Sequence, residues 1–326
     1  MIRTEKNYHG RKYIFCDDNG NLNFEIDEPQ EIKTPEYFTK YYSINKNSID
    51  SVLNNYLYAA HPKQFNDPFD CFPYLIDTSD ISDNDIDEIA EQFKRINIEL
   101  DKEKIKNDRI EFSRVWDLVF SSCGIISLND SETENPNLWA NYASNNKGFS
   151  VTYDKKSFPN EYFCGPFRID YQNKLCKYKF DRDYIGNLFL YLTTVKSNDW
   201  SGEKEWRYIA LGKDTMYIPC THHGLMKEQT IQNRKFTLAK NAITEIKLGF
   251  LFFNVCDYEK RENYFYVNLN NDEENDLKFN LLSFAKHNNI KVSMMYLDKL
   301  DFKFVPVILD YELFESKTLK FRIPLK

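Results

Sequence analysis

Hydrophobic and polar residues follow two different periods along this chain. Between Ile86 and Leu100 the apolar residues recur at every third or fourth position with charged residues between them, which is typical of an amphipathic helix. Other stretches gather or alternate apolar residues over four to eight positions, as strands do. The clearest predicted strands are 37–43, 57–60, 124–128, 148–153, 242–248, 264–269 and 291–297. Because strands and helices are interspersed without strict alternation, we predict an α+β fold with a mixed, mostly antiparallel sheet core and flanking helices.

Turn-forming residues divide the chain into three predicted parts. Segments 11–16 and 21–26 flank Asp17-Asp18-Asn19-Gly20, which is a hairpin signal because Asn-Gly readily adopts positive φ angles. Residues 1–30 are therefore predicted to form an N-terminal β-hairpin appendage. We assign residues 31–250 to a core domain and residues 251–326, which have their own strand and helix pattern, to a C-terminal α/β extension packed on it.

The composition narrows the class of protein. The chain has 326 residues, of which 42% are hydrophobic and 16% aromatic, so a sizeable core is available. No apolar run approaches the roughly 20 residues that span a bilayer, and the first residues lack the apolar centre of a secretory signal. The net charge of −7 argues against a broad nucleic-acid-binding surface. The cysteines form no C-x-x-C pair, which favours reduced thiols, and we predict a cytoplasmic protein without a membrane partner.

Residues 200–207 (Trp-Ser-Gly-Glu-Lys-Glu-Trp-Arg) concentrate the strongest candidate chemistry. In an extended chain Glu203, Glu205 and Arg207 share one face, while the intervening lysine and tryptophan point to the other. Two carboxylates so placed repel by about 2–3 kcal/mol at an effective dielectric constant near 20, unless Arg207 or a ligand compensates. Such settings shift carboxylate pKa values, so we predict a catalytic role for both glutamates. The alternative is a salt-bridged strand face without function.

A second candidate is the segment 65–70 (Phe-Asn-Asp-Pro-Phe-Asp). Asp67-Pro68 fits the first two positions of a type I turn, because proline fixes φ and aspartate caps a downstream amide. We predict that Asn66, Asp67 and Asp70 contribute to substrate binding from this loop. A purely structural corner is the alternative.

Aromatic residues supply a third candidate. Pro136 starts a predicted short helix with Asn135 as its cap, and Gly148 is predicted to end it in a left-handed conformation. Trp139 and Tyr142 lie on one side of this helix, where they either pack in the core or stack on a nucleobase or nicotinamide. Trp200 is a further predicted substrate contact.

Metal and phosphate motifs are missing from the sequence. Cys220-Thr221-His222-His223 resembles half of a zinc site, but no second Cys/His cluster lies near it in the sequence. No glycine-rich phosphate loop, G-x-S-x-G elbow or H-E-x-x-H motif occurs. We therefore predict no metal cofactor.

Several of these pieces together resemble a bacterial family known as domain of unknown function 2971. The motifs that carry the resemblance are, in order, Lys-Tyr-Tyr-Ser at 40–43, Leu-Tyr-Ala-Ala at 57–60, Phe-Asn-Asp-Pro-Phe-Asp at 65–70, Leu-Trp-Ala-Asn-Tyr-Ala at 138–143, Lys-Gly-Phe at 147–149 and Trp200 with Glu-Lys-Glu-Trp-Arg at 203–207. The match covers about residues 37 to 250. Tyr42 departs from the family, which tends to carry arginine at that position. The resemblance implies membership but no reaction.

A weaker resemblance in motif order links the chain to ADP-ribosyltransferases. Lys40 and Tyr42 on a first strand, Tyr58 on a second and the Glu-x-Glu pair at 203–205 follow the order of that class. It implies an ADP-ribosyltransferase-like fold and NAD as the substrate. Tyr58 would stack on nicotinamide, Glu205 would hold a ribose hydroxyl and Glu203 would orient or deprotonate the acceptor. Lys40 or Arg207 would meet the pyrophosphate, and Tyr42 would contribute to substrate binding from the first strand.

The leading interpretation is therefore an NAD-consuming enzyme, either an ADP-ribosyltransferase or an NAD glycohydrolase, acting as a bacterial toxin or anti-phage defence effector. It binds a nucleotide, and the sequence leaves a macromolecular acceptor or an antitoxin partner open. One alternative is a metal-dependent nuclease that uses Asp67, Asp70, Glu203 and Glu205 around a hard cation. The other is a non-enzymatic module that senses a nucleotide.

Overall fold

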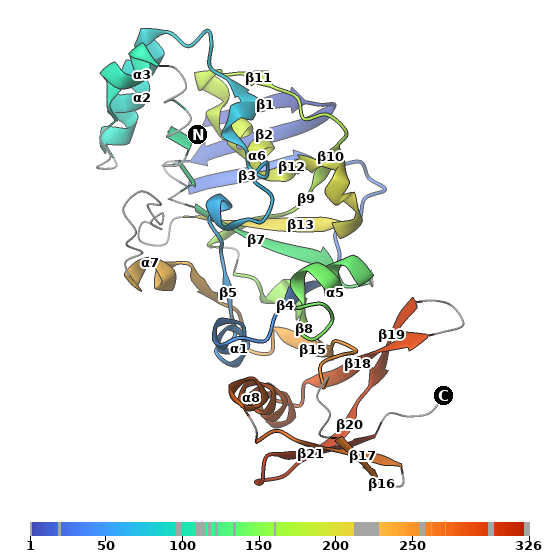
Figure 1. The fold of residues 1–326 in the computed structure, drawn as a ribbon. Helices are drawn as coiled ribbons and strands as arrows, with labels where there is room; N and C mark the ends of the chain where they lie inside the picture. The colour runs from blue at the N-terminus through green and yellow to red at the C-terminus, as the bar shows by residue number, and fades with distance from the viewer. Residues whose placement is uncertain are drawn as a thin grey trace.

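The computed structural model describes residues 2–18, 21–95, 100–108, 112, 115–116, 119–120, 123–132, 135–159, 161–211, 228–253, 258–261, 263–270, 272–298 and 303–322. Within them the largest sheet has eight strands and crosses the middle of the molecule (Figure 1). In spatial order these strands are β19 (Lys303–Ile308), β18 (Lys291–Asp298), β15 (Ile243–Leu248), β8 (Phe149–Asp154), β4 (Tyr37–Tyr42), β7 (Cys123–Asp130), β13 (Glu205–Leu211) and β9 (Phe163–Arg168). All neighbours pair antiparallel except β15 and β18, which are parallel.

Strand β13 shows how this sheet separates two cores. Its first six residues are buried, because the sheet is covered on both faces. Trp206, Tyr208 and Ala210 join the larger hydrophobic cluster on one face. Ile209 joins the second cluster on the other face, and Arg207 has the same orientation as Ile209. The side chain of Arg207 is therefore directed to the face opposite Trp206, as the alternation of residues predicts.

A three-stranded sheet forms the N-terminal part. It contains β1 (Ile2–Tyr8), β2 (Arg11–Asp18) and β3 (Asn21–Asp27), paired antiparallel. The predicted pairing of 11–16 with 21–26 is thereby confirmed, although Asn19 and Gly20 lie outside the described residues. Helix α6 (Ile185–Thr194) is buried along its whole length apart from its first residue, and a Cβ on Gly186 would lie 2.4 Å from the Phe15 ring. The glycine thus permits α6 to pack against β2.

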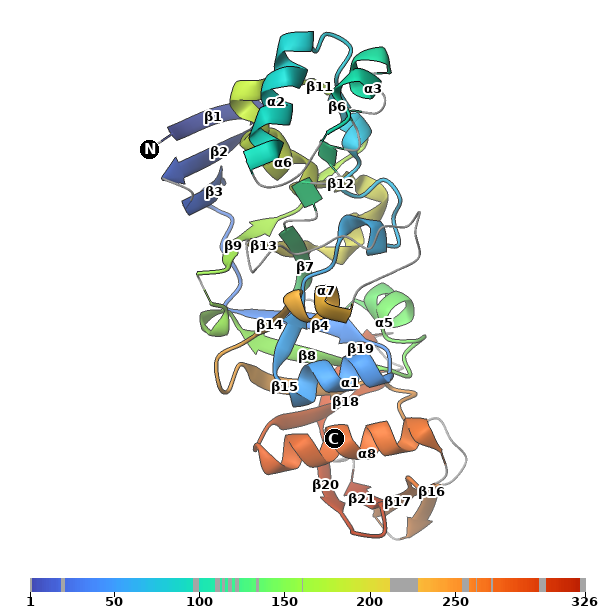
Figure 2. The same cartoon turned by 90° about the vertical axis from the view of Figure 1, so that its left-hand side faces the viewer.

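The C-terminal residues enter the same sheet as the predicted core domain. Strands β18 and β19 extend it beyond β15, and helix α8 (Glu273–His287) lies between it and a four-stranded sheet (Figures 1 and 2). That sheet contains β16 (Tyr258–Arg261), β17 (Tyr264–Asn268), β21 (Thr318–Arg322) and β20 (Asp310–Leu313). One hydrophobic cluster runs from Phe38 in β4 through Leu281 in α8 to Phe321 in β21. The C-terminal residues therefore share a core with the central sheet.

The remaining elements cover the sheets or connect them. The other α-helices whose bounds are described include α1 (Lys46–Leu53), α2 (Asp83–Arg95), α3 (Lys102–Asn107), α5 (Pro136–Tyr142) and α7 (Glu228–Asn233). The short strands are β5 (Tyr56–Tyr58) with β14 (Lys235–Thr237), β10 (Asp170–Gln172) with β12 (Val195–Ser197), and β6 (Ile76–Asp77) with β11 (Tyr178–Lys179). Figure 2 shows an elongated molecule with α2 and α3 at one end and the C-terminal sheet at the other. None of the described helices has the length and apolarity to cross a membrane.

The predicted α+β class with mostly antiparallel pairing is confirmed, while one local detail is corrected. Asn135 caps α5 as predicted, since its side chain accepts a hydrogen bond from the backbone of Asn137. The chain then leaves the helix through positive φ angles at residues 144–146 and not at Gly148. Gly148 is required for another reason, because a Cβ there would lie 2.1 Å from the carbonyl oxygen of Tyr42.

Candidate active site

A cavity of about 310 Å³ lies where the central strands meet the 65–70 loop and α5. Eight of the residues predicted from the sequence line it: Lys40, Tyr58, Asn66, Asp70, Tyr142, Glu203, Glu205 and Arg207. They come from six separate segments of the chain. The predicted catalytic and binding residues are therefore brought together, although their arrangement differs from the expected one.

The two glutamates do not lie on one continuous strand. Glu203 ends the 3₁₀-helix η6 (Asn198–Glu203), and β13 begins at Glu205. Between them Lys204 adopts the left-handed conformation, with φ of 48° and ψ of 48°. This turn replaces the predicted extended backbone. The carboxylates still meet, because both of them contact the same lysine.

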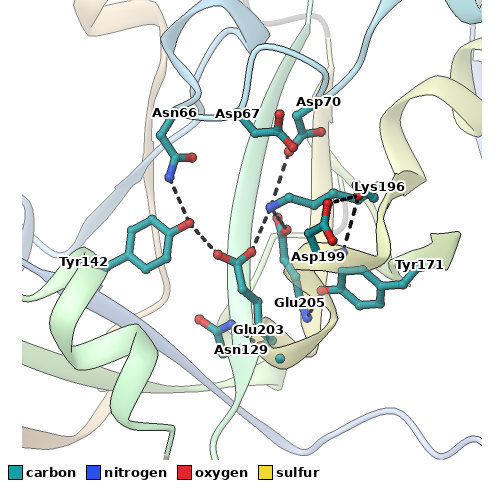
Figure 3. A network of polar contacts seen from close by, with 12 residues as sticks. Asn66, Asp67, Asp70, Asn129, Tyr142, Tyr171, Lys196, Asp199, Glu203 and Glu205 are labelled. Atoms are coloured by element: carbon teal, nitrogen blue, oxygen red, sulfur yellow. Dashed lines mark hydrogen bonds and ion pairs between the residues drawn. The ribbon is translucent and has the colours of Figure 1, made fainter. Parts of the chain in front are cut away.

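That lysine is Lys196 in β12, which the sequence analysis did not single out. Its Nζ lies 2.7 Å from Glu203 Oε2, 3.2 Å from Glu205 Oε2 and 3.6 Å from Asp70 Oδ2 (Figure 3). The Trp200 ring also covers this ammonium group, with its centroid 5.0 Å from Nζ. The sequence contains one signal for this role, because Lys196 directly follows the mostly apolar segment 185–195. A charged residue in such a position is rarely buried unless it has charged partners.

Arg207 is fully buried and uses all five of its N–H donors within the protein. Nε donates to Glu205 Oε1 at 2.7 Å, and Nη2 donates to Glu205 Oε2 at 3.1 Å and to Asp70 Oδ2 at 2.5 Å. Nη1 donates to Asp70 Oδ1 at 2.8 Å and to the carbonyl oxygen of Thr193 at 2.9 Å. A guanidinium group has five N–H donors, so none is left for a ligand. The predicted contact between Arg207 and a pyrophosphate is therefore wrong.

These contacts fix the charges of the network. Burial by itself would raise the pKa of Glu205, but Arg207 and Lys196 outweigh it and hold that pKa at about 2. Burial would likewise lower the pKa of Lys196, yet Glu205, Asp70 and Glu203 raise it above its usual value. The pKa of Arg207 is also raised, because Asp70 and Glu205 outweigh burial. Glu205 is thus ionised, and its negative charge is bound by Arg207 and Lys196.

Glu203 has a different environment from Glu205. Its Oε1 accepts a hydrogen bond of 2.6 Å from the Tyr142 hydroxyl, and its Oε2 accepts one from Lys196. Asn66 Nδ2 in turn donates to the Tyr142 hydroxyl oxygen at 3.3 Å, and Asn129 Nδ2 donates to the Glu203 backbone carbonyl at 2.7 Å (Figure 3). Burial, together with Glu203, raises the pKa of Tyr142, so its hydroxyl keeps its proton. Glu203 is therefore a carboxylate held in one orientation at the cavity wall.

Lys40 and Tyr58 complete the polar lining of the cavity. Lys40 Nζ donates to the carbonyl oxygen of Ser127 at 3.1 Å. Burial lowers the pKa of Lys40 to about 8, although Glu205 counteracts part of this effect. The Tyr58 hydroxyl forms a hydrogen bond with the side chain of Gln64. Both residues reach the cavity from short neighbouring segments, β4 and β5.

Four predicted substrate-binding residues do not line the cavity. The Tyr42 hydroxyl bonds to that of Tyr153 within the core, and the Tyr42 ring stacks on Phe149. Asp67 Oδ1 accepts a hydrogen bond of 2.9 Å from the backbone of Phe69, which is the structural alternative weighed for this turn. Trp139 is 1% exposed and packs edge-on against Tyr41, and Trp200 covers Lys196. These positions stabilise the site and do not present groups to its interior.

The arrangement does not suit a metal ion. The described residues contain no group of three or more His, Cys, Asp or Glu side chains with the geometry to hold one. Lys196 Nζ already takes the position between Asp70, Glu203 and Glu205 where a cation would bind. Cys220, His222 and His223 lie outside the described residues.

No protein-family model matches this chain, and no curated protein or solved structure is significantly similar to it. Membership of the family known as domain of unknown function 2971 therefore stays a prediction. Any statement about function has to be argued from the geometry of the cavity.

Proposed function

We propose that the cavity is the active site of an NAD-consuming enzyme, an ADP-ribosyltransferase or an NAD glycohydrolase, in which Glu203 is the catalytic carboxylate. One observation carries the proposal. Glu203 is oriented by Tyr142 and Lys196 at the wall of a cavity that also holds the aromatic ring of Tyr58. A fixed carboxylate can stabilise the positive charge that develops as a nicotinamide–ribose bond breaks, and an aromatic ring beside it can pack against nicotinamide.

The chemistry follows from the charge that develops during bond cleavage. As the bond between the ribose carbon and the nicotinamide nitrogen breaks, the bonding electrons leave with nicotinamide and the ribose acquires oxocarbenium character. A carboxylate next to that carbon stabilises the positive charge, as in glycoside hydrolysis. Water or the nucleophile of an acceptor then forms the new bond and loses a proton. Glu203 performs this role because its oxygens have fewer cationic partners than those of Glu205.

The roles of the two glutamates therefore differ from those expected from motif order. Glu205 is bound by Arg207 and Lys196 through both oxygens, which makes it a positioning residue for these cations. We propose that Glu203 faces the ribose and that Tyr58 packs against nicotinamide. The cavity volume lies near the lower end of the roughly 300–1,000 Å³ common for ligand sites, so the adenosine half remains outside in this proposal.

The proposal also includes an ADP-ribosyltransferase-like core and a role as a bacterial toxin or anti-phage effector. Lys40 in β4, Tyr58 in β5 and the acids at the start of β13 line one cavity in the order that ADP-ribosyltransferases use, which supports an ADP-ribosyltransferase-like core. An enzyme that consumes NAD in the bacterial cytoplasm would act as a toxin or an anti-phage effector, held in check by an antitoxin or directed to a macromolecular acceptor. The metal-dependent nuclease is disfavoured, because Lys196 occupies the space between the carboxylates.

The test is release of nicotinamide from NAD by the purified protein. Glu203→Gln keeps the size and hydrogen-bonding capacity of the side chain but removes its charge, and the rate is expected to fall about a hundredfold or more. Glu273→Gln is the matched control, because Glu273 is 68% exposed at the start of α8 and its variant should retain full activity. Absence of nicotinamide release by the unaltered protein, with or without candidate acceptors, contradicts an NAD-consuming enzyme. Thermal stabilisation by NAD without turnover then indicates the sensing module.

A further inference from the structure

Two lysines line the same cavity in opposite electrostatic environments. Lys196 contacts three carboxylates, so its ammonium form is strongly favoured. Lys40 contacts a neutral carbonyl oxygen, that of Ser127, and within the described residues no carboxylate forms an ion pair with it. Pairs of like groups whose environments push their pKa values apart indicate different chemical roles. Lys196 has a structural role, because it holds the three carboxylates together. Lys40 has no such role, so another function is expected for it.

The surroundings of Lys40 favour its neutral amine. Ile125 from β7, Tyr41 from β4 and Leu138 from α5 contribute apolar surface to the same cavity. Loss of water around an ammonium group disfavours its charge, and this is the principal reason that the pKa of Lys40 falls to about 8. The other charged or titratable groups that line the cavity are Tyr41 from β4, Tyr58 from β5, Asp70 from the 65–70 loop, Tyr142 from α5, Lys196 from β12, Glu203 from η6, and Glu205 and Arg207 from β13. Of the three carboxylates among them, Asp70 and Glu205 form ion pairs with both Arg207 and Lys196, and Glu203 forms one with Lys196.

We propose that Lys40 is a nucleophilic amine that forms an imine with the carbonyl group of an aldehyde or ketone ligand in this cavity. The neutral nitrogen attacks the carbonyl carbon, and the carbonyl oxygen takes up a proton to give a carbinolamine. Loss of one water molecule then forms the carbon–nitrogen double bond, so the amine and the carbonyl compound yield the imine and water. No oxidant or reductant takes part. Desolvated lysines of this kind are established nucleophiles toward carbonyl compounds.

The inference goes beyond NAD cleavage and does not depend on it. Any small ligand with an aldehyde or ketone that fits the cavity is a candidate, including the open-chain form of a sugar. A fixed cation for an anionic ligand is the competing role for Lys40. The two roles separate experimentally, because arginine retains the positive charge but cannot form an imine.

The experiment traps the imine on the intact chain. The protein is incubated with pyridoxal, which carries an aldehyde but no phosphate, and then reduced with borohydride at a series of pH values. Peptide mass spectrometry measures the modification of each lysine in the same sample. Lys33 is the internal control, since its side chain is exposed and none of the described residues forms an ion pair with it. At neutral pH Lys40 is expected to react roughly a hundredfold faster than an ordinary lysine, which has a pKa of about 10.4.

The pH dependence supplies the second readout. The Lys40 reaction should reach half of its maximal rate near pH 8, because the reactive neutral amine forms as the pH rises through that value. Lys40→Arg should remove this fast modification, whereas Lys33→Arg should leave it unchanged, with circular dichroism confirming that both variants are folded. Reaction of Lys40 at the rate of Lys33, or a midpoint near pH 10, overturns the proposal. If Lys40→Arg does not fold, the rate and pH midpoint of Lys40 modification in the unaltered protein still test the proposal.

Discussion

The two glutamates of this cavity differ in the hydrogen-bond and ion-pair partners of their carboxylate oxygens. The oxygens of Glu205 are bound by Arg207 and Lys196, while Glu203 receives one neutral hydroxyl and one ammonium group. Sequence reasoning identified both glutamates and assigned the ribose to Glu205 from motif order. It could not foresee their different partners, because these depend on Lys196, a residue from another segment. It also placed Arg207 correctly at the site and gave it the wrong role, since the positions of Asp70 and Thr193 are set by the fold.

Removal of the Tyr142 hydroxyl tests whether the orientation of Glu203 matters. In Tyr142→Phe the carboxylate loses a 2.6 Å hydrogen bond, which is worth about 1.5–3 kcal/mol for a bond to a charged group. The turnover number for nicotinamide release should fall roughly tenfold with little change in KM. Tyr74→Phe is the control, because Tyr74 is 44% exposed and should tolerate the loss. An unchanged turnover number in Tyr142→Phe would show that this contact is only structural.

The depressed pKa of Glu205 predicts how stability depends on pH. The carboxylate is stabilised in the folded state relative to the unfolded one, so its contribution is complete above its ordinary pKa of 4.5. That contribution is lost as the pH falls from about 4.5 toward about 2, where the folded-state group takes up its proton. Urea unfolding at several acidic pH values should show this decline, and Glu205→Gln should make it less steep. Equal slopes for both proteins would refute the assignment.

Individual elements were predicted with differing success. Alternation identified β13, and the proline and asparagine at 135–136 located the start of α5, because these signals are local. The break between Glu203 and Glu205 was missed, because lysine gives no sequence signal for a left-handed conformation. Tertiary packing determines such details, so they cannot be derived from a local pattern.

The left-handed Lys204 provides a test at the level of the element. Its side chain is exposed, so a substitution mainly alters the backbone preference. Lys204→Gly should leave the thermal midpoint equal or higher, because glycine adopts positive φ without steric cost. Lys204→Val should lower stability by roughly 1–2 kcal/mol, because a β-branched residue is strained there. Calorimetry of both variants checks this, and a Val variant as stable as the Gly variant would argue against the turn.

The whole molecule is organised by the eight-stranded sheet. The alternating patterns predicted its strands, but strand order was not derivable, since pairing partners such as β15 and β18 are separated by more than forty residues of chain. The boundary drawn near residue 250 crosses this sheet, because β18 and β19 extend it after β15. The hydrophobic cluster that includes Phe38 and Phe321 is likewise shared by both sides of that boundary.

Removal of residues 251–326 should therefore destabilise the whole fold, including the central sheet. The shortened chain would expose one edge of β15 and the apolar face that α8 covers, and both are known causes of aggregation. We expect the truncated protein to be insoluble or to unfold without a cooperative thermal transition. Soluble yield and circular dichroism provide the measurement, with the full chain as reference. A stable, monomeric fragment 1–250 would show that the C-terminal part is an independent domain.

The position of Lys196 among three acids has a consequence for the conditions under which the site can work. Its central positive charge is a covalent part of the polypeptide and arrives with the folded chain. A chelator therefore cannot remove this charge, and depletion of metal ions cannot lower its occupancy. The balance of charge at this site is therefore complete as soon as the chain has folded, whatever the supply of divalent ions.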